Sequence, residues 1–218
     1  MPLWLAPQPL VLASKSDVRG KILAAAGLRF EIRPAQIDER AAEAQAGPLD
    51  AAAAAQLLAR KKAESVAATL PGRLVLGADQ TLARGNMRFS KPADRAEAAE
   101  QLRKLRGRTH ELNSALALVR DGKLLFDCVD TARLTMRDFA DRFLEEYLDM
   151  AGRAALASVG GYQLEGVGVN LFERTSSCTS SGRWGPAVAR GAPRSSWGTA
   201  SGGWPWTHAP RSATWPSR

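Results

Sequence analysis

Residues 10–19 read Leu-Val-Leu-Ala-Ser-Lys-Ser-Asp-Val-Arg, and this stretch decides the fold. The apolar run 10–13 predicts a short buried strand. The hydroxyl-bearing turn after it, with Ser14 or Ser16 as the N-cap, predicts a helix that ends at Ala26. A strand that turns directly into a helix is typical of α/β proteins, and the free N–H groups at the start of the helix favour an anion such as a phosphate.

The segments that follow alternate between the two kinds of secondary structure. We expect a strand around Phe30 and Ile32, an Ala-rich helix at 48–70, a strand at 74–78, a helix at 94–105, a hairpin of 110–119 with 123–136, a helix at 138–150 and a last strand at 167–172. Such alternation predicts an α/β fold with a mixed, mainly parallel sheet flanked by helices.

The composition changes sharply after Arg174. Residues 175–218 contain no Leu, Ile, Met or Phe, yet they hold five of the six Trp among many Ser, Gly, Pro and Arg. We therefore expect a folded domain at 1–174 and an irregular, disordered tail at 175–218. The tail could be plain disorder, or an Arg/Trp-rich arm for nucleic acid or a membrane surface. We favour a third origin, an altered reading frame, because out-of-frame GC-rich genes tend to give these residue types.

The net charge of +8 suggests a nucleic-acid binder, but its location argues otherwise. Five Arg of the tail supply much of it, which leaves 25 basic and 22 acidic residues in 1–174. That mild excess suits a small anionic substrate. No apolar run approaches the roughly 18 residues of a membrane span. The N-terminus does not resemble a signal peptide, and the two Cys lack metal-binding spacing, so we expect a cytoplasmic protein.

Several polar residues follow the expected strands. Asp79 and Gln80 come directly after the strand at 74–78, where a carboxylate can hold a metal or orient a water. The paired acids Asp38 and Glu39 could share a magnesium ion with Asp79. Arg19 could add a bidentate phosphate contact. Each of these signals, taken singly, is also compatible with a helix cap, a turn or a solvated charged loop.

Two lysines and a glycine-rich segment complete the candidates. Lys62 belongs to a basic run, which by itself is compatible with a solvated helix face. Lys91 is more specific, because Pro92 restricts it to extended geometry. The glycines within 160–168 permit close approach of the backbone to a ligand. This segment lacks the Gly-Lys-Ser/Thr ending of a Walker loop, and no helix pattern follows it as in a dinucleotide fingerprint.

In sequence order these motifs resemble the Maf (septum formation) family over about residues 8–174. The segments that carry the resemblance are Leu-Val-Leu-Ala-Ser-x-Ser-x-x-Arg (10–19), Asp38-Glu39, Leu58-Ala59-x-x-Lys62-Ala63, Gly77-Ala78-Asp79, Lys91-Pro92, Leu105-x-Gly107-Arg108-x-His110 and Gly161-Tyr162-x-x-x-Gly166-x-Gly168. The resemblance implies a two-lobed α/β enzyme with a central cleft, like the inosine triphosphatases. It would hydrolyse nucleoside triphosphates to nucleoside monophosphate and pyrophosphate with Mg²⁺ or another divalent cation such as Mn²⁺. The implied role is sanitation of the nucleotide pool, with a link to septum formation and cell division arrest.

The resemblance also assigns roles to individual residues. Asp79 would be the catalytic acid/base, and Glu39 with Asp79 would form the metal site, supported by Asp38. The triphosphate would be bound by four residues, Ser14, Arg19, Lys62 and Lys91. Gln80 and Glu165 match the branch of the family associated with 7-methyl-GTP, whereas the dTTP/UTP branch, which stays an alternative, has Thr and Gln at these places.

The chain departs from the family pattern in two places. Asp17 and Val18 replace the Pro-Arg or Pro-x that usually precedes Arg19, and the usual C-terminal strand and helix are absent after Arg174. Two alternatives stay open. The pI near 10 and the Arg/Trp-rich tail would suit a non-enzymatic nucleic-acid-binding protein, and a catalytically inactive relative is the other, although the intact Asp79, Lys62 and Lys91 argue against it. As partners we expect a nucleoside triphosphate, with a homodimer left open, and neither a membrane nor a specific nucleic acid.

Overall fold

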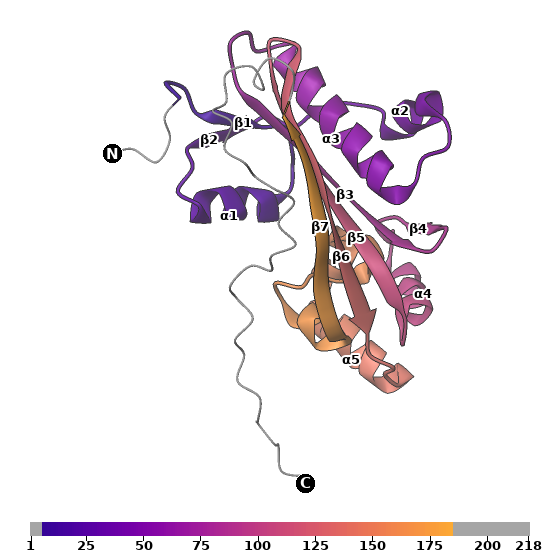
Figure 1. Ribbon diagram of the computed structural model, residues 1–218. Helices are drawn as coiled ribbons and strands as arrows, with labels where there is room; N and C mark the ends of the chain where they lie inside the picture. The colour runs from indigo at the N-terminus through magenta and orange to yellow at the C-terminus, as the bar shows by residue number, and fades with distance from the viewer. Residues whose placement is uncertain (1–5, 185–218) are drawn as a thin grey trace.

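The computed structural model describes residues 6–184. Its centre is one seven-stranded sheet in the order β2-β1-β3-β5-β6-β7, with β4 paired to β3 (Figure 1). The strands are β1 (Leu10–Leu12), β2 (Phe30–Ile32), β3 (Val75–Arg84), β4 (Met87–Phe89), β5 (Thr109–Arg120), β6 (Lys123–Met136) and β7 (Phe172–Trp184).

The sheet is mixed, and the α/β class expected from the sequence is confirmed. Strand β1 runs parallel to β2 and to the start of β3. The other pairings, β3 with β4, β3 with β5, β5 with β6 and β6 with β7, are antiparallel. Parallel pairing, which we expected to dominate, is thus confined to the β2-β1-β3 edge. The antiparallel pairing of β5 with β6 follows from the tight turn between them, where Asp121 and Gly122 both adopt positive φ.

Helices cover both sides of this sheet. They are α1 (Asp17–Ala25), α2 (Glu39–Ala46), α3 (Ala51–Ala67), α4 (Arg95–Leu105), α5 (Asp141–Ala151) and the short α6 (Arg153–Ala157), with 3₁₀ turns at Val159–Gly161 and Val167–Leu171. Figure 1 shows α1 and α3 on opposite sides of the strands, with α4 and α5 at the far end of the sheet. Among the described residues, no helix is both long and apolar enough to cross a membrane.

The buried residues form two hydrophobic clusters, and each cluster is the core of one of the two lobes of the protein. In the first, the Ala-rich face of α3 packs on small residues of β1, β3 and β5. Gly77 makes this close approach possible, because a Cβ there would overlap the carbonyl oxygen of Ala59. The second cluster joins Leu82 of β3 to side chains of α4 and α5 such as Leu102 and Leu144. The small residues therefore fix α3 tightly on the strand that carries Asp79.

Three expectations about strand ends need correction. Asp79 and Gln80 do not end a strand, because β5 continues to pair with β3 beyond the end of β1. Residues 167–171 form a 3₁₀ turn rather than a strand. Strand β7 continues past the expected domain boundary at Arg174 as far as Trp184, where it pairs with β6. The remaining part of the expected tail, residues 185–218, lies outside the described residues.

Candidate active site

Two adjoining cavities lie between the lobes. The large cavity has a volume of about 910 Å³ and the small cavity about 270 Å³. They adjoin because Arg19, Asp79 and Gln80, among others, line both of them. Eight candidate side chains from the sequence line these cavities. The large cavity is lined by Ser14, Arg19, Glu39, Lys62, Asp79, Gln80 and Lys91, and the small cavity by Glu165 as well as Arg19, Asp79 and Gln80, whereas Asp38 lines neither.

Arg19 is held at the start of α1, directly beside β3. Its Nη1 donates to the hydroxyl of Ser14 at 2.8 Å and to the carbonyl oxygen of Ala78 at 2.9 Å. Ser14 follows β1 and is buried, and its hydroxyl also accepts from the N–H of Ser16 at 3.2 Å. Strand β1 runs parallel to the first part of β3, with Leu12 opposite Leu76, so the turn that follows β1 at Ser14 lies next to Asp79 in the middle of β3.

The ammonium of Lys62 joins two carboxylates. Lys62 Nζ lies 2.5 Å from Asp79 Oδ1 and 2.8 Å from Glu39 Oε1. Lys62 projects from α3, Asp79 from the middle of β3, and Glu39 from the first turn of α2. Asp38, which we expected to support a metal, instead caps α2 by accepting from the N–H of Ala41.

Burial shapes the electrostatics of this cluster. Removal from water raises the pKa of Asp79, and the ion pair with Lys62 opposes that rise. Burial likewise lowers the pKa of Arg19, while the carboxylates of Asp79 and Glu39 oppose the change. An aspartate with a raised pKa is a better proton acceptor than an exposed one, so Asp79 is suited to general-base chemistry.

The large cavity is rich in cationic groups. Its lining includes six Lys and Arg side chains, namely Lys15, Arg19, Arg40, Lys62, Arg88 and Lys91, against four carboxylates, Asp17, Glu39, Glu43 and Asp79. Lys91 is exposed and makes no ion pair within the described part of the chain, so its ammonium is available to a ligand. A basic cleft of this kind attracts a polyanion.

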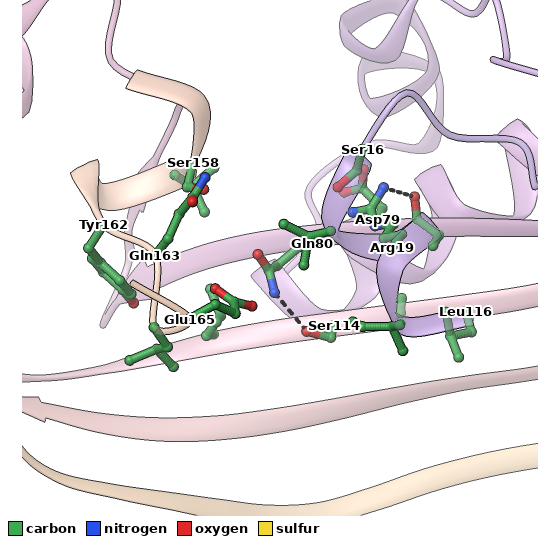
Figure 2. Close-up of a pocket in the computed structure, with 17 residues that line it drawn as sticks. Ser16, Arg19, Asp79, Gln80, Ser114, Leu116, Ser158, Tyr162, Gln163 and Glu165 are labelled. Atoms are coloured by element: carbon green, nitrogen blue, oxygen red, sulfur yellow. Dashed lines mark hydrogen bonds between the residues drawn. The ribbon is translucent and has the colours of Figure 1, made fainter. Parts of the chain in front are cut away.

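The small cavity combines apolar walls with a few polar groups. Gln80 Nε2 donates to the hydroxyl of Ser114 at 3.0 Å on the floor formed by β3 and β5. Figure 2 shows Gln163 and Glu165 on one side of Gln80 and Ser16 with Arg19 on the other. Leucine and isoleucine side chains complete the lining, among them Ile22, Leu112, Leu116 and Leu164. Such a site suits a flat ring that carries hydrogen-bonding edges.

A buried hydrogen bond anchors the loop that carries Gln163 and Glu165. His110 Nε2 and the hydroxyl of Tyr162 lie 2.8 Å apart, and Tyr147 donates to the carbonyl oxygen of Gly161 at 2.9 Å. Gly160 and Gly161 both have a φ of 78°, a conformation that favours glycine. Burial lowers the pKa of His110 to about 4, so its ring is neutral at pH 7.

Sequence reasoning missed several lining residues. Ser114 and Gln163 sit in the small cavity, and Arg40, Glu43 and Arg88 in the large one. Ser114 carried a usable signal, since it is a polar residue in an otherwise mainly apolar strand. Arg88 and Glu43 carried none, because their meeting depends on how β4 approaches α2.

The sequence matches the family model for Maf-like proteins over residues 9–181. The chain belongs to the Maf family. Among similar proteins, a "Nucleoside triphosphate pyrophosphatase" of Rhodopseudomonas palustris (strain BisB18) is 56% identical over 173 residues, which cover 79% of this chain and 86% of the relative. The family match extends past Arg174 into β7, in agreement with the observed strand.

Two further relatives of the Maf chain bear on its substrate. A "Nucleoside triphosphate pyrophosphatase" of Nitrobacter winogradskyi is 52% identical over 174 residues, covering 80% of this chain and 86% of that protein. A "7-methyl-GTP pyrophosphatase" of Rhizobium etli is 51% identical over 170 residues, covering 76% of this chain and 84% of that protein. The relatives are thus all named as pyrophosphatases, while their names differ in how narrowly they define the substrate.

Proposed function

We propose that this Maf protein hydrolyses nucleoside triphosphates to nucleoside monophosphate and pyrophosphate. The observation that carries the proposal is the buried carboxylate of Asp79, which lies where a cationic cavity meets a smaller, partly apolar one. Phosphoryl transfer depends mostly on positioning and on neutralising charge, and this junction offers both. The relatives named as nucleoside triphosphate pyrophosphatases support the same reaction.

The two cavities suggest how the substrate is oriented. The base would enter the small cavity beside Gln80 and Glu165, and the triphosphate would lie in the large cavity. This orientation brings the α-phosphate to Asp79 and Arg19, which line both cavities. The β- and γ-phosphates would then extend toward Lys91. Ser14 holds Arg19 in place through its hydroxyl.

The carboxylates of Glu39 and Asp79 lie close enough together to share a divalent cation. Both contact the ammonium of Lys62, so their oxygens converge on one point. The described residues contain no cluster of three or more His, Cys, Asp or Glu side chains that could hold a metal. Mg²⁺ commonly uses one or two carboxylates and takes its other ligands from water and substrate phosphates. We propose Glu39 and Asp79 as protein ligands of Mg²⁺ or Mn²⁺, which would neutralise phosphate charge when bound.

The chemical step requires a water and a proton acceptor. In the proposed step, Asp79 accepts a proton from a water molecule as the water oxygen attacks the α-phosphorus. The bond between the α-phosphorus and the oxygen bridging to the β-phosphate breaks, and its electron pair leaves with pyrophosphate. Lys62 keeps Asp79 oriented through the 2.5 Å contact, and Arg19 stabilises charge on the α-phosphate.

We propose 7-methyl-GTP as the preferred substrate. Gln80 supplies an amide and Glu165 a carboxylate to the small cavity, and a purine edge offers partners for both. The 51% identity to the Rhizobium etli protein named for this activity supports the choice. A preference for dTTP or UTP is the alternative. We further propose a cytoplasmic role in clearing the nucleotide pool, which is where such a reaction finds its substrates.

The test is release of pyrophosphate from a panel of nucleoside triphosphates. The full chain is incubated with each triphosphate and Mg²⁺, and pyrophosphate and nucleoside monophosphate are both quantified. Equal amounts of the two products are expected, with no activity after chelation of the metal. Release of inorganic phosphate together with nucleoside diphosphate would place cleavage at the wrong bond and contradict the proposal.

A further inference from the structure

Arg88 and Glu43 form a forked ion pair at the rim of the large cavity. Arg88 Nη1 lies 2.6 Å from Glu43 Oε2, and Arg88 Nη2 lies 3.1 Å from Glu43 Oε1. The two residues come from β4 and α2, which are far apart in sequence. This parallel pair of hydrogen bonds is the geometry in which a guanidinium also binds two oxygens of a phosphate.

The fork lines the large cavity and not the small cavity, in which the base is proposed to bind. Arg19, Asp79 and Gln80 line both cavities, whereas Arg88, Glu43 and Lys91 line the large one alone. Arg88 lies on β4, and Lys91 follows two residues after the end of that strand. A triphosphate that starts at the junction and extends into the large cavity can therefore reach Arg88.

Glu43 pairs with the guanidinium from a helix that lies at the surface of the protein. Its helix, α2, contains no buried residue. Glu43 is the partner of the Arg88 guanidinium within residues 6–184, so an anion that displaced the carboxylate would find the fork already oriented. The hydrogen bond with Glu43 is the main cause that raises the pKa of Arg88, and Asp79 adds to it more weakly. The negative charge of Asp79 thus already acts on the guanidinium of Arg88.

We propose that Arg88 binds the terminal phosphate of the substrate, and that Glu43 is the carboxylate this phosphate replaces. The inference rests on the proposed function, since it assumes a nucleoside triphosphate in the two cavities. It explains why a cationic cavity contains a carboxylate beside Arg88: Glu43 keeps the fork of Arg88 in the binding geometry while the site is empty. On this proposal a diphosphate lacks the phosphate that replaces Glu43, so it leaves the pair intact.

The proposal predicts opposite effects for the two partners. Arg88→Ala removes the fork, so affinity for a triphosphate should fall while affinity for the diphosphate of the same nucleoside stays nearly constant. Glu43→Gln removes the competing charge and frees Arg88, so affinity for the triphosphate should rise. A purely structural ion pair would give the same sign for both substitutions, because either one breaks it.

The experiment measures binding without turnover. Dissociation constants of the α,β-methylene analogues of GTP and GDP are measured by titration calorimetry with Mg²⁺ for the full chain and its variants. Arg84→Ala is the matched control, because Arg84 lies on the same hairpin, contacts the Lys104 carbonyl and lines neither cavity. For Arg88→Ala we expect roughly tenfold weaker binding of the GTP analogue and less than about twofold change for the GDP analogue.

Three results would overturn the assignment: equal weakening of both analogues by Arg88→Ala, no weakening of either, or weaker triphosphate binding in Glu43→Gln. Arg88→Lys, which keeps the charge but loses the fork, should fall between wild type and Arg88→Ala. Failure of the proposed reaction is recognised separately. In that case wild type releases no pyrophosphate from any triphosphate, whatever the binding constants show.

Discussion

The ammonium of Lys62 lies 2.5 Å from the carboxylate of Asp79, on a helix that rests directly against the strand below it. The contact depends on the close approach of α3 to β3 at Gly77, where any larger residue would strike the backbone of Ala59. Side chains that alternate along β3 then place Gly77 and Asp79 on the same face, toward α3. The packing of the first lobe therefore sets the geometry of the proposed catalytic carboxylate.

Asp79→Asn tests this carboxylate. We expect turnover to fall by about two orders of magnitude or more, because the substitution removes both the proton acceptor and a proposed metal ligand. Pyrophosphate release measures the loss, and circular dichroism checks the fold. Asp149→Asn is the matched control, since Asp149 is exposed on α5 and lines neither cavity. A folded Asp79→Asn chain that keeps more than half of the wild-type rate would show that the role is misassigned.

The sequence predicted which candidate residues lie together better than it predicted the sheet. Ser14 and Asp79 could be placed together because each follows an apolar run, and the carboxyl ends of parallel strands meet. The full length of β3 was not predicted, because the polar residues Asp79, Gln80 and Thr81 interrupt its apolar pattern. The partners that keep these residues in the strand come from β5 and α3. A local pattern does not contain those partners.

Two other misses have similar causes. Strand β7 is rich in Ser and Thr and lacks aliphatic residues after Phe172, so it gave no hydrophobic pattern, although the backbone of β6 pairs with it. The pairing of Arg88 with Glu43 depends on tertiary approach of β4 and α2, and nothing in either local segment indicates it. The order of the motifs was enough to identify the eight candidate residues. Contacts between distant segments could be seen only in the structure.

The preference for the base is the second prediction. If Gln80 and Glu165 contact the base, kcat/KM for 7-methyl-GTP should exceed that for dTTP and UTP by about tenfold or more, because a wrong base would cover these polar groups without pairing them. Glu165→Gln keeps the shape and removes the charge, so it should narrow this ratio while leaving the fold unchanged. Equal kcat/KM for the three substrates, or a clear preference for dTTP, would contradict the assignment.

A third prediction concerns His110 and pH. The folded pKa of His110 is about 4, below the 6.5 expected in the unfolded chain, because burial disfavours the charged ring. Between these values the unfolded chain binds more protons, so the free energy of unfolding rises with pH through this window. The contribution is complete above about pH 6.5 and is lost as the pH falls toward 4. It amounts to roughly 3 kcal/mol.

Urea denaturation at several pH values measures this contribution. In His110→Gln the pH dependence between 4 and 6.5 should be shallower than in wild type by up to about 1.4 kcal/mol per pH unit. Tyr162→Phe is the control, because it removes the hydroxyl that contacts His110 Nε2 yet leaves the titrating ring. That variant should be less stable by about 1–3 kcal/mol while keeping the wild-type slope. Identical slopes in wild type and His110→Gln would show that His110 does not titrate as proposed.

The last prediction concerns strand β7 and where the folded unit ends. Strand β6 pairs with β7 from Met136 opposite Phe172 to Phe126 opposite Trp184, so the strand covers most of the length of β6. A chain shortened to residues 1–184 keeps every one of these pairs. It should retain pyrophosphate release and melt within a few degrees of the full chain. A chain shortened to residues 1–174 loses the pairs from Leu134 opposite Thr175 to Phe126 opposite Trp184. Most of β6 then becomes an open edge.

An open edge of this length exposes unpaired N–H and C=O groups, which lowers stability and promotes association between chains. We therefore expect the 1–174 chain to melt at a lower temperature and to elute earlier, or aggregate, in size-exclusion chromatography. Thermal denaturation and chromatography of the two shortened chains side by side make the comparison. Equal stability of both would mean that pairing with β7 contributes nothing to the fold. Loss of stability already in the 1–184 chain would instead assign a structural role to residues 185–218.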